Sequence, residues 1–278
     1  MQLINAISEL RQRLSEEASV VLIPTMGNLH DGHLALVEAA KYYGSCIVVS
    51  IFVNRLQFEP GGDFDRYPRT LQQDCEKLQA LGVNIVFVPD EEEIYPVPQQ
   101  VLVQPPPLAE TLEGEHRPGH FAGMATVVLK LLNIVQPRAA IFGKKDYQQL
   151  AIVREMAKQL NLPVEIVGED TIRAIDGLAL SSRNGYLSST ERAEAPRLNR
   201  HLQAIKAAIE SGQRDYAVME SVATDALQQR GWKVDYIAVR EQQDLSMPHS
   251  ESKHLVVLGA AWLGKTRLID NLEVDALM

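Results

Sequence analysis

The chain has 278 residues, of which 46% are hydrophobic and 23% are charged, and its formal net charge at pH 7 is −9. A chain of this length buries a sizeable core and usually folds as one or two domains. The acidic balance argues against a general nucleic-acid-binding protein, whose footprint is basic, but it is compatible with a local basic pocket for a phosphate ligand. The apolar runs are shorter than the ~20 residues of a membrane span, so no membrane association is expected.

Cysteine usage and the first residues bear on the compartment. Cys46 and Cys75 are the two cysteines, too few for a disulfide framework, so a reducing, cytoplasmic location is expected. Cys46 lies inside the run SCIVVSIFV and is predicted to be a buried core thiol. The opening stretch MQLINAISELRQRLSEE predicts an amphipathic helix with Asn5 or Ser8 near its start. It lacks the apolar core and cleavage site of a signal peptide.

Short apolar runs alternate with helical patterns through the first two-thirds of the chain. Strands are predicted at 20–24, 45–54, 84–89, 139–143 and 164–168. Helices are predicted at about 33–43, 70–81, 120–136 and 146–161. Strands without polar alternation, separated by helices, are typical of a parallel sheet covered on both faces. We therefore predict a doubly wound, Rossmann-like α/β domain over residues 1–175.

The pattern changes after about residue 175. Two helical segments, at about 189–211 and 215–230, are followed by the runs WKVDYIAVR, HLVVLGAAWLG and TRLIDNLEV. These three runs alternate more and end in glycine-rich or polar turns, as the strands of an antiparallel sheet do. We predict a smaller α+β C-terminal domain over residues 176–278.

The stretch PTMGNLHDGH, residues 24–33, lies between the first predicted strand and a helix, and ligands of open α/β sheets bind beyond the carboxyl ends of strands. Gly27 permits a turn that a side chain would obstruct, and Gly32 lets the backbone approach a ligand. The helix N-terminus favours a phosphate group. His30 and His33 are three residues apart, so both could donate hydrogen bonds to a transition state that builds negative charge.

Three further polar stretches follow predicted strands. FGKKDYQQL (142–150) brings two lysines to a helix start, and GLALSSRNGYL (177–187) offers two hydroxyls and an arginine as phosphate donors. SIFVNRLQF (50–58) carries Asn54 and Gln57 past the end of the second strand. Asp74, in the next predicted helix, is a candidate Mg²⁺ contact. We expect these stretches to face one crevice, because the carboxyl ends of parallel strands share an edge.

The residues alone leave alternatives open. His30 and His33, with His116 and His120, could bind a metal, although no acidic or thiol ligand stands at a recognisable zinc spacing. A metal-dependent hydrolase is therefore one alternative. Another nucleotidyltransferase and a nucleotide-binding regulatory module without catalysis are the others.

Six ordered blocks resemble a known family. PTMGNLHDGH has the form of the H-x-G-H signature of the adenylate-forming nucleotidyltransferases. Within that superfamily the pantothenate synthetase family, the pantoate–β-alanine ligases, is resembled by SIFVNRLQF, GDFDRYPRT, RPGHFAGMATVVLKL, FGKKDYQQL and DGLALSSRNGYL. The blocks run from about residue 20 to 190, and six in order are highly specific. The C-terminal third is similar only in length and pattern.

The resemblance implies an AMP-forming ligase of coenzyme A biosynthesis. Such an enzyme condenses (R)-pantoate with β-alanine to give pantothenate, AMP and pyrophosphate through a pantoyl adenylate intermediate. ATP is then a substrate and Mg²⁺ a cofactor, and the enzyme is expected to be a cytoplasmic homodimer without nucleic-acid or membrane partners.

The resemblance also implies which residues form the site. His30, His33 and Lys145 match catalytic residues, with His33 in the acid role, and Gln57 and Gln149 match the amides that hold pantoate. The implied ATP-binding set is Met26, Gly27, Asn28, Leu29, His30, Asp31, Gly32, His33, Gly143, Lys144, Lys145, Asp146, Ile172, Leu180, Ser181, Ser182 and Arg183. Within it, residues 181–183 match a mobile segment that closes over the phosphates. The sequence departs from the family at Arg55, where proline is common, and has LSSR in place of the commoner MSSR.

Overall fold

The computed structural model describes residues 1–58 and 64–276, so the first two residues of the GDFDRYPRT block lie outside the described residues. The chain divides into two compact units. The first contains Met1–Gly143 and Ile152–Asp170, and the second contains Lys144–Ala151 and Thr171–Met278. This division groups Lys144–Ala151 with the C-terminal unit, which the sequence did not predict. The predicted domain boundary near residue 175 stays a prediction.

The first unit is built on a six-stranded parallel sheet with the strand order β1-β4-β3-β2-β5-β6. The strands are β1 (Gln2–Ile4), β2 (Val20–Thr25), β3 (Cys46–Ile51), β4 (Ile85–Phe87), β5 (Ala139–Gly143) and β6 (Glu165–Glu169). All six residues of β3 are buried, which explains why its sequence shows no polar alternation. The winding direction reverses between β2 and β5, and such a switch point is where open α/β sheets bind ligands.

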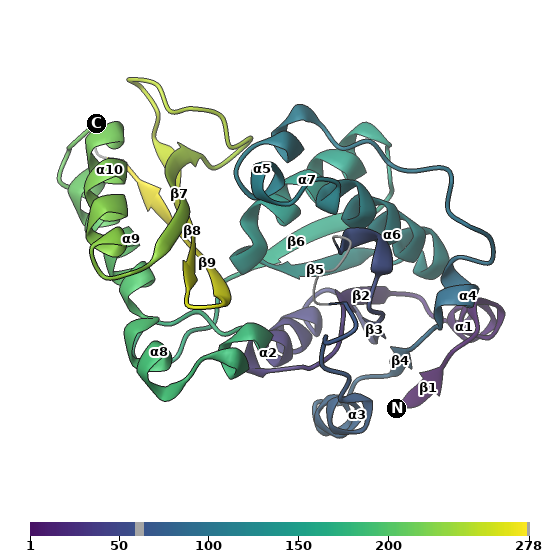
Figure 1. Ribbon diagram of the computed structural model, residues 1–278. Helices are drawn as coiled ribbons and strands as arrows, with labels where there is room; N and C mark the ends of the chain where they lie inside the picture. The colour runs from purple at the N-terminus through teal and green to yellow at the C-terminus, as the bar shows by residue number, and fades with distance from the viewer. Residues whose placement is uncertain (59–63, 277–278) are drawn as a thin grey trace. The chain divides into compact units, whose positions relative to one another are not determined.

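Helices cover both faces of this sheet (Figure 1). Right-handed crossovers place α1 (Ile7–Leu14), α6 (His120–Val135) and the later part of α7 (Tyr147–Gln159) on one face. They place α2 (Asp31–Ala40) and α3 (Leu71–Ala80) on the other face. The core beneath α2 and α3 includes Val21, Ile23, Leu36, Val37 and Leu78. The connections of this unit also contain α4 (Glu91–Ile94), α5 (Glu113–His116), η1 (Arg55–Gln57) and η2 (Pro107–Glu110).

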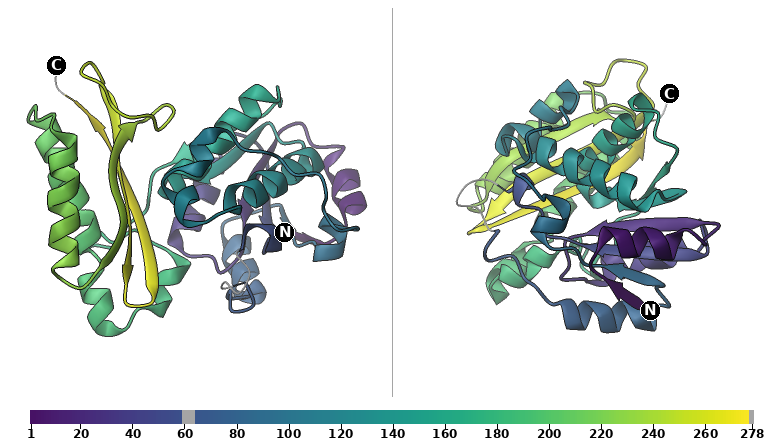
Figure 2. Two further views of the ribbon diagram at one scale, coloured as in Figure 1. Left: turned by 45° about the horizontal axis from the view of Figure 1, so that its top comes forward. Right: turned by 90° about the vertical axis from the view of Figure 1, so that its right-hand side faces the viewer.

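The C-terminal unit contains a three-stranded antiparallel sheet of β7 (Lys233–Glu241), β8 (His254–Leu263) and β9 (Thr266–Asp275). The helices α9 (Arg197–Glu210) and α10 (Tyr216–Gln228) lie along one face of that sheet (Figure 2). Their apolar faces and the strands share a core that includes Leu202, Ile205 and Val257. The same unit carries η3 (Lys144–Asp146), η4 (Ser182–Tyr186) and α8 (Ser189–Glu194).

The predicted fold class is confirmed: a parallel α/β sheet is followed by a smaller antiparallel α+β unit. The helix predicted in the opening stretch is α1, and residues 2–4 before it form β1 and pair with β4, a contact that no periodic pattern announces. One local prediction is wrong. The helix predicted over 189–211 is two helices, since the proline ring of Pro196 at the N-cap of α9 interrupts the hydrogen-bond ladder.

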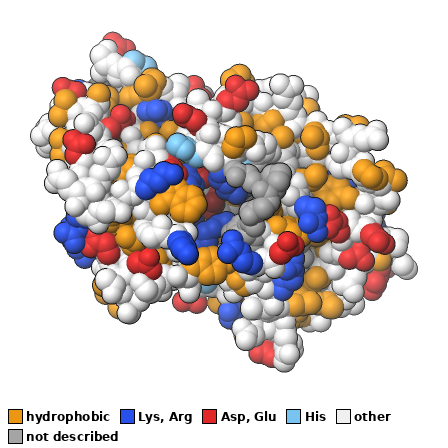
Figure 3. Space-filling view, in the orientation of Figure 1, with side chains coloured by type: hydrophobic (Ala, Val, Ile, Leu, Met, Phe, Trp, Pro, Cys, Tyr) orange, Lys and Arg blue, Asp and Glu red, His pale blue; other side chains and the backbone are white. Residues whose placement is uncertain are grey.

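Cys46 is buried, as its place in a strongly apolar run predicts. Both cysteines are unpaired thiols, and burial raises the pKa of Cys46 to about 11, which leaves it protonated and unreactive at neutral pH. Among the described residues no helix is long and apolar enough to span a membrane. Figure 3 shows acidic and basic side chains interspersed over the face in view.

Candidate active site

The loop after β2 turns sharply before α2 begins. Gly27 has a φ of +84°, and a Cβ there would lie 3.0 Å from Ile51 Cγ2, so a side chain would be strained as well as crowded. The Gly27 amide donates to Thr25 Oγ1 (3.2 Å), and that hydroxyl donates to Ser50 O (2.8 Å). The turn is therefore tied to β3, and it places the α2 N-terminus beyond the carboxyl end of β2.

Asp74 of α3 braces the same loop. The carboxylate is 1% exposed and accepts from the amides of Asn28 (2.9 Å) and Leu29 (2.8 Å) and from Thr70 Oγ1 (3.1 Å). Lys77 Nζ donates to Leu29 O at 2.6 Å. No group of three or more His, Cys, Asp or Glu residues in the described part of the chain could hold a metal. The Asp74 carboxylate thus accepts hydrogen bonds from two backbone amides and a hydroxyl, and its predicted contact with Mg²⁺ stays a prediction.

His30 and His33 form a capping box at the start of α2. His30 Nδ1 accepts from the Gly32 amide (3.1 Å), and His33 Nδ1 accepts from the His30 amide (3.3 Å). A neutral imidazole that accepts at Nδ1 carries its proton on Nε2, so the hydrogen bonds assign this tautomer to both rings. The ring centroids are 4.2 Å apart. The α2 N-terminus thus presents two imidazole N–H donors side by side.

Gln57 is the last residue of η1, the turn that follows β3. Its Nε2 donates to Met26 Sδ (3.1 Å), and its Oε1 accepts from Asn54 Nδ2 (3.1 Å). Asn54 is 1% exposed; its Nδ2 also donates to Gly123 O (3.1 Å), and its Oδ1 accepts from Tyr95 Oη (2.8 Å). These bonds orient the Gln57 amide and join the loops after β2 and β3.

The helix α6 packs directly on the backbone of η1. A Cβ on Gly123 would lie 2.1 Å from Leu56 O and 2.7 Å from the Gln57 amide nitrogen, so this approach requires glycine. His120 is 7% exposed, and its Nδ1 lies 2.8 Å from Gln57 O. The RPGHFAGM block therefore supports the turn that carries Gln57.

The second unit carries the lysine turn η3, which follows the last residue of β5 in the chain. Lys144 Nζ forms a 2.8 Å ion pair with Glu273 Oε2 of β9. Lys145 Nζ lies 3.9 Å from Asp146 Oδ2, a much longer pair, and its side chain is 18% exposed. The two lysines therefore differ: the Lys144 ammonium is tied to the C-terminal sheet, whereas the Lys145 ammonium makes a longer contact within its own turn.

Residues 171–183 form a small hairpin that leads into η4. The Leu180 amide donates to Ile172 O (2.9 Å), and Ser181 Oγ caps η4 by accepting from the Arg183 amide (3.3 Å). Ile172 is 38% exposed, and residues 180–183 are half-buried. The predicted phosphate donors Ser181, Ser182 and Arg183 thus lie together in one turn.

The structure divides the predicted site residues between the two units. The first unit contains Met26, Gly27, Asn28, Leu29, His30, Asp31, Gly32, His33, Gln57 and Gly143. The second contains Lys144, Lys145, Asp146, Gln149, Ile172, Leu180, Ser181, Ser182 and Arg183. Gln149 lies half-buried in the first turn of α7.

Sequence reasoning missed the residues that hold these turns. Gly123 gave a usable signal, because a glycine inside a helical pattern often marks a close approach of backbones. Asp270 and Asn271 of β9 provided a weaker signal, as two adjacent polar residues within a strand that reads as largely apolar. Tyr95 and Glu273 gave none, since their partners lie far away in the sequence.

Comparison with known proteins decides the family. The sequence model of the family described as Pantoate-beta-alanine ligase matches residues 2–273. The chain belongs to the pantoate–beta-alanine ligase family. Its relatives include two proteins named pantothenate synthetase. That of Nitrosospira multiformis is 57% identical over 274 residues, which cover 99% of this chain and 98% of the relative. That of Nitrosomonas europaea is 58% identical over 271 residues, which cover 98% of each chain.

Solved structures of pantoate–beta-alanine ligases share the fold. The crystal structure of pantothenate synthetase from Thermus thermophilus has a TM-score of 0.94 and 45% identity, and covers 99% of this chain and 100% of its own. The pantoate-beta-alanine ligase from Francisella tularensis, complexed with beta-gamma ATP and beta-alanine, has a TM-score of 0.83 and 34% identity. That match covers 98% of this chain and 97% of the relative. The family predicted from the six sequence blocks is confirmed.

Proposed function

We propose that this member of the pantoate–beta-alanine ligase family condenses (R)-pantoate with β-alanine at the expense of ATP, in coenzyme A biosynthesis. The observation that carries the proposal is similarity over nearly the whole chain to pantothenate synthetases, one relative having been crystallised with beta-gamma ATP and beta-alanine. The histidine loop and the lysine turn supply donors suited to a charged nucleotide.

The first step forms pantoyl adenylate. A pantoate carboxylate oxygen attacks the α-phosphorus of ATP, a new acyl O–P bond forms, and the bond between the α-phosphorus and the bridging oxygen breaks to release pyrophosphate. Because the reactants carry negative charge, the enzyme must align them and neutralise charge that develops on the phosphate oxygens.

In the first unit we assign that work to the α2 N-terminus. The Nε2–H groups of His30 and His33 would donate to phosphate oxygens, with His33 as the acid, and the α2 dipole would add to their effect. The turn from Met26 to Leu29, braced by Asp74, would line the nucleotide pocket.

In the second unit Lys145 would contact the phosphates as a point charge. Ser181, Ser182 and Arg183 would add donors that close over the triphosphate, and the backbone at Ile172 would contact adenine. Lys144, which pairs with Glu273, would contribute mainly by holding the turn.

Pantoate would be held by Gln57 and Gln149. Neutral amides can bind its hydroxyl and carboxylate oxygens without repelling the α-phosphate. The hydrogen bonds that Asn54 and Met26 make with Gln57 would orient its amide before pantoate arrives.

The second step forms the amide. The neutral amine of β-alanine attacks the acyl carbon of pantoyl adenylate, the bond from that carbon to the AMP oxygen breaks, and the nitrogen loses a proton. Water must be excluded from the adenylate meanwhile, which a closing segment at residues 181–183 would achieve.

Mg²⁺ neutralises phosphate charge and in ATP-dependent enzymes is commonly bound through the phosphates and waters, so we propose that it enters with ATP. We also propose that the enzyme is a cytoplasmic homodimer. Sedimentation equilibrium of the purified protein tests the dimer, and a mass of one chain would contradict it.

Isotope exchange between pyrophosphate and ATP tests the two-step reaction. Protein, ATP and Mg²⁺ are combined with pantoate, β-alanine, both or neither, and AMP is followed in parallel. Exchange should need pantoate but not β-alanine, and AMP should be released steadily only with both. Exchange that absolutely requires β-alanine would contradict a separate adenylation step, and no AMP with the full mixture would contradict the function.

A further inference from the structure

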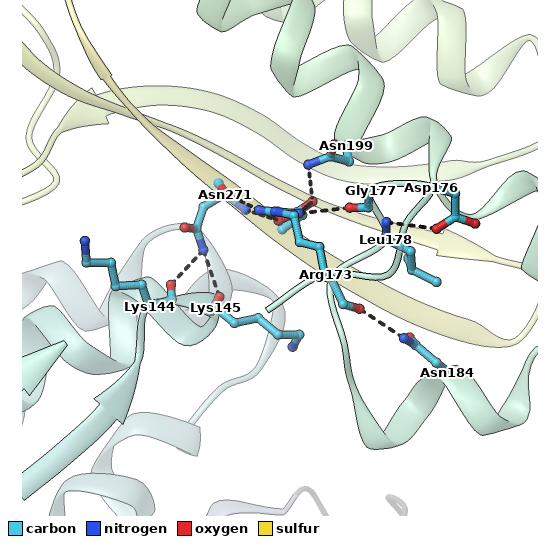
Figure 4. A network of polar contacts seen from close by, with 11 residues as sticks. Lys144, Lys145, Arg173, Asp176, Gly177, Leu178, Asn184, Asn199 and Asn271 are labelled. Carbon is cyan, nitrogen blue, oxygen red and sulfur yellow. Dashed lines mark hydrogen bonds and ion pairs between the residues drawn. The ribbon is translucent and has the colours of Figure 1, made fainter. Parts of the chain in front are cut away.

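The turn η3 is held by two side chains of β9, a strand more than a hundred residues later in the chain. Figure 4 shows the first of them, Asn271. Asn271 Nδ2 donates to Lys144 O at 2.9 Å and to Lys145 O at 2.9 Å. A side-chain amide nitrogen has two hydrogens, so one group can satisfy both carbonyls. Asn271 therefore holds the two carbonyls on either side of the Lys145 α-carbon.

The clamp has a rigid base. Asn271 is 6% exposed and lies within β9, where it is paired with Leu258 of β8. Its amide donates to Asp270 Oδ1 (2.7 Å), and its carbonyl accepts from Arg173 Nη2 (3.0 Å). Arg173 in turn forms a bidentate pair with Asp270, at 2.7 and 2.8 Å, and Asn199 Nδ2 donates to Asp270 Oδ2. The backbone of Asn271, from which its side chain extends, is thus anchored by neighbours that are themselves fixed.

Glu273 adds a second contact from the same strand. Its Oε2 accepts from Lys144 Nζ (2.8 Å), and its Oε1 accepts from Tyr147 Oη (2.8 Å). Lys206 Nζ donates to the Glu273 carbonyl (2.8 Å), which links the site to α9. Residues 271 and 273 stand two apart in the strand, so they lie on one face of the sheet. One face of β9 therefore holds η3 by backbone and by side chain.

These contacts hold the two lysines in different ways. The Lys144 ammonium is engaged by the strand that holds the turn, whereas β9 holds Lys145 through its carbonyl and leaves its ammonium to the long pair with Asp146. Fixing the backbone of Lys145 narrows the positions that its ammonium can reach. We propose that Asn271 is a positioning residue for the adenylation step, acting through the backbone of Lys145.

The proposal rests on the proposed function, in which Lys145 contacts the phosphates of ATP. Loss of the clamp leaves two carbonyls without their donor and lets the turn shift. A displacement of about 1 Å at a reacting site can slow a reaction by about 10²-fold. The amide-forming step does not use the triphosphate, so it should change little.

The test compares the two half-reactions in a double-mutant cycle. Asn271→Ala, Lys145→Ala and the double variant are measured by single-turnover formation of pantoyl adenylate, and by β-alanine consumption of supplied pantoyl adenylate. Asn271→Ala should slow adenylation about tenfold or more and amide formation less than about threefold. In the Lys145→Ala background, Asn271→Ala should change the rate of adenylation less than about twofold, because the effects of residues that act as a unit are not additive.

Two further variants keep the result interpretable. Asn271→Ser shortens the side chain and keeps a polar group, and it replaces the alanine variant if that variant does not fold. We expect it too to slow adenylation much more than amide formation. Asp235→Asn is the matched control, because the bonds that Asp235 accepts from Arg267 Nε (2.7 Å) and Trp262 Nε1 (3.2 Å) join strands of the same sheet. The control should leave both half-reactions unchanged.

Several outcomes overturn the proposal. They are equal slowing of both half-reactions, an Asn271→Ala effect that multiplies fully with that of Lys145→Ala, or normal adenylation in both Asn271 variants. A wild-type protein that makes no pantothenate refutes the proposed function itself. An active wild type with a fully active Lys145→Ala variant refutes only the lysine assignment and the clamp that depends on it.

Discussion

The turns η1 and η3 are held in place by different kinds of contact. Each is a three-residue 3₁₀ turn that follows a strand of the parallel sheet in the chain, and each bears a residue that we propose contacts substrate, Gln57 or Lys145. The turn η1 is held largely by close packing, because the backbone of α6 meets it at Gly123. The turn η3 is held by the hydrogen bonds that Asn271 donates to its carbonyls and by the ion pair of Lys144 with Glu273.

The difference suits the chemistry of the two side chains. A neutral amide must present its oxygen and nitrogen in a defined orientation, which a tightly packed turn with bonds to both amide atoms provides. A lysine acts as a point charge on a flexible stem, so fixing its backbone is the main control available. A turn held by close packing should be displaced abruptly when a side chain at the contact is enlarged. A turn held by hydrogen bonds should be displaced in smaller steps as single bonds are removed.

Removing a proposed donor to the phosphates should have the largest effect. We expect Lys145→Ala and His33→Ala to stay folded but to form pantoyl adenylate at least ~100-fold more slowly, because losing one donor to developing charge costs about 3–4 kcal/mol. Single-turnover kinetics of each half-reaction measures this. Supplied pantoyl adenylate should bypass much of the Lys145→Ala defect.

Lys144→Ala is the matched control on the same turn. Its ammonium pairs with Glu273, and a partly exposed ion pair contributes at most about 1 kcal/mol. We therefore expect the rate of adenylation to fall roughly fivefold or less. A Lys144 variant as slow as the Lys145 variant would show that both ammonium groups serve the phosphates.

Removing the amides should affect pantoate more than ATP. Gln57→Ala and Gln149→Ala each delete a hydrogen bond to a charged or hydroxyl group, worth about 1.5–3 kcal/mol, so a rise in KM for pantoate of about 10- to 100-fold is expected. The KM for ATP should rise far less. Steady-state kinetics with each substrate varied in turn decides this, and equal changes in both values would argue against a pantoate site at these residues.

Gly123→Ala tests whether η1 depends on close packing. The new Cβ would lie 2.1 Å from Leu56 O, and overpacking of this kind costs about 1–3 kcal/mol. We expect a lower free energy of unfolding and about a tenfold higher KM for pantoate, since the shift needed would move Gln57. Urea unfolding and steady-state kinetics measure the two effects. Asn133→Ala, on the exposed side of the same helix, is the control; a Gly123→Ala enzyme with unchanged kinetics would remove the steric distinction between the turns.

Tyr95→Phe should give the smallest effect, because it deletes one hydrogen bond and keeps the ring. The hydroxyl donates to Asn54 Oδ1, and burial raises the pKa of Tyr95 above its ordinary value of 10.0, so it stays a donor across the neutral range. Losing a hydrogen bond worth about 1 kcal/mol predicts roughly a fivefold higher KM for pantoate. This increase should not depend on pH between about 6 and 9. The ring contacts with Phe52 and with Lys130 Nζ remain possible for phenylalanine. A pH-dependent loss would point to a role for the hydroxyl beyond orienting Asn54.

The sequence by itself determined the fold class, most elements and the family. Strand 139–143 was predicted with the bounds that the structure has, because a short apolar run between helical patterns is a local signal. The ordered blocks, from PTMGNLHDGH to DGLALSSRNGYL, identified the family that the comparisons confirm. Their site roles remain proposals.

Only the tertiary structure decided how the site residues are held. The Asp74 carboxylate accepts from the amides of Asn28 and Leu29, 46 and 45 residues away in the sequence, and its predicted contact with Mg²⁺ stays a prediction. Asn271 reaches the Lys145 carbonyl across 126 residues. A residue's type and its neighbours in sequence fix its own secondary structure and the side chains it can offer. The partner of a buried polar group is set by which strands and helices assemble around it, and no local pattern in the chain contains that information.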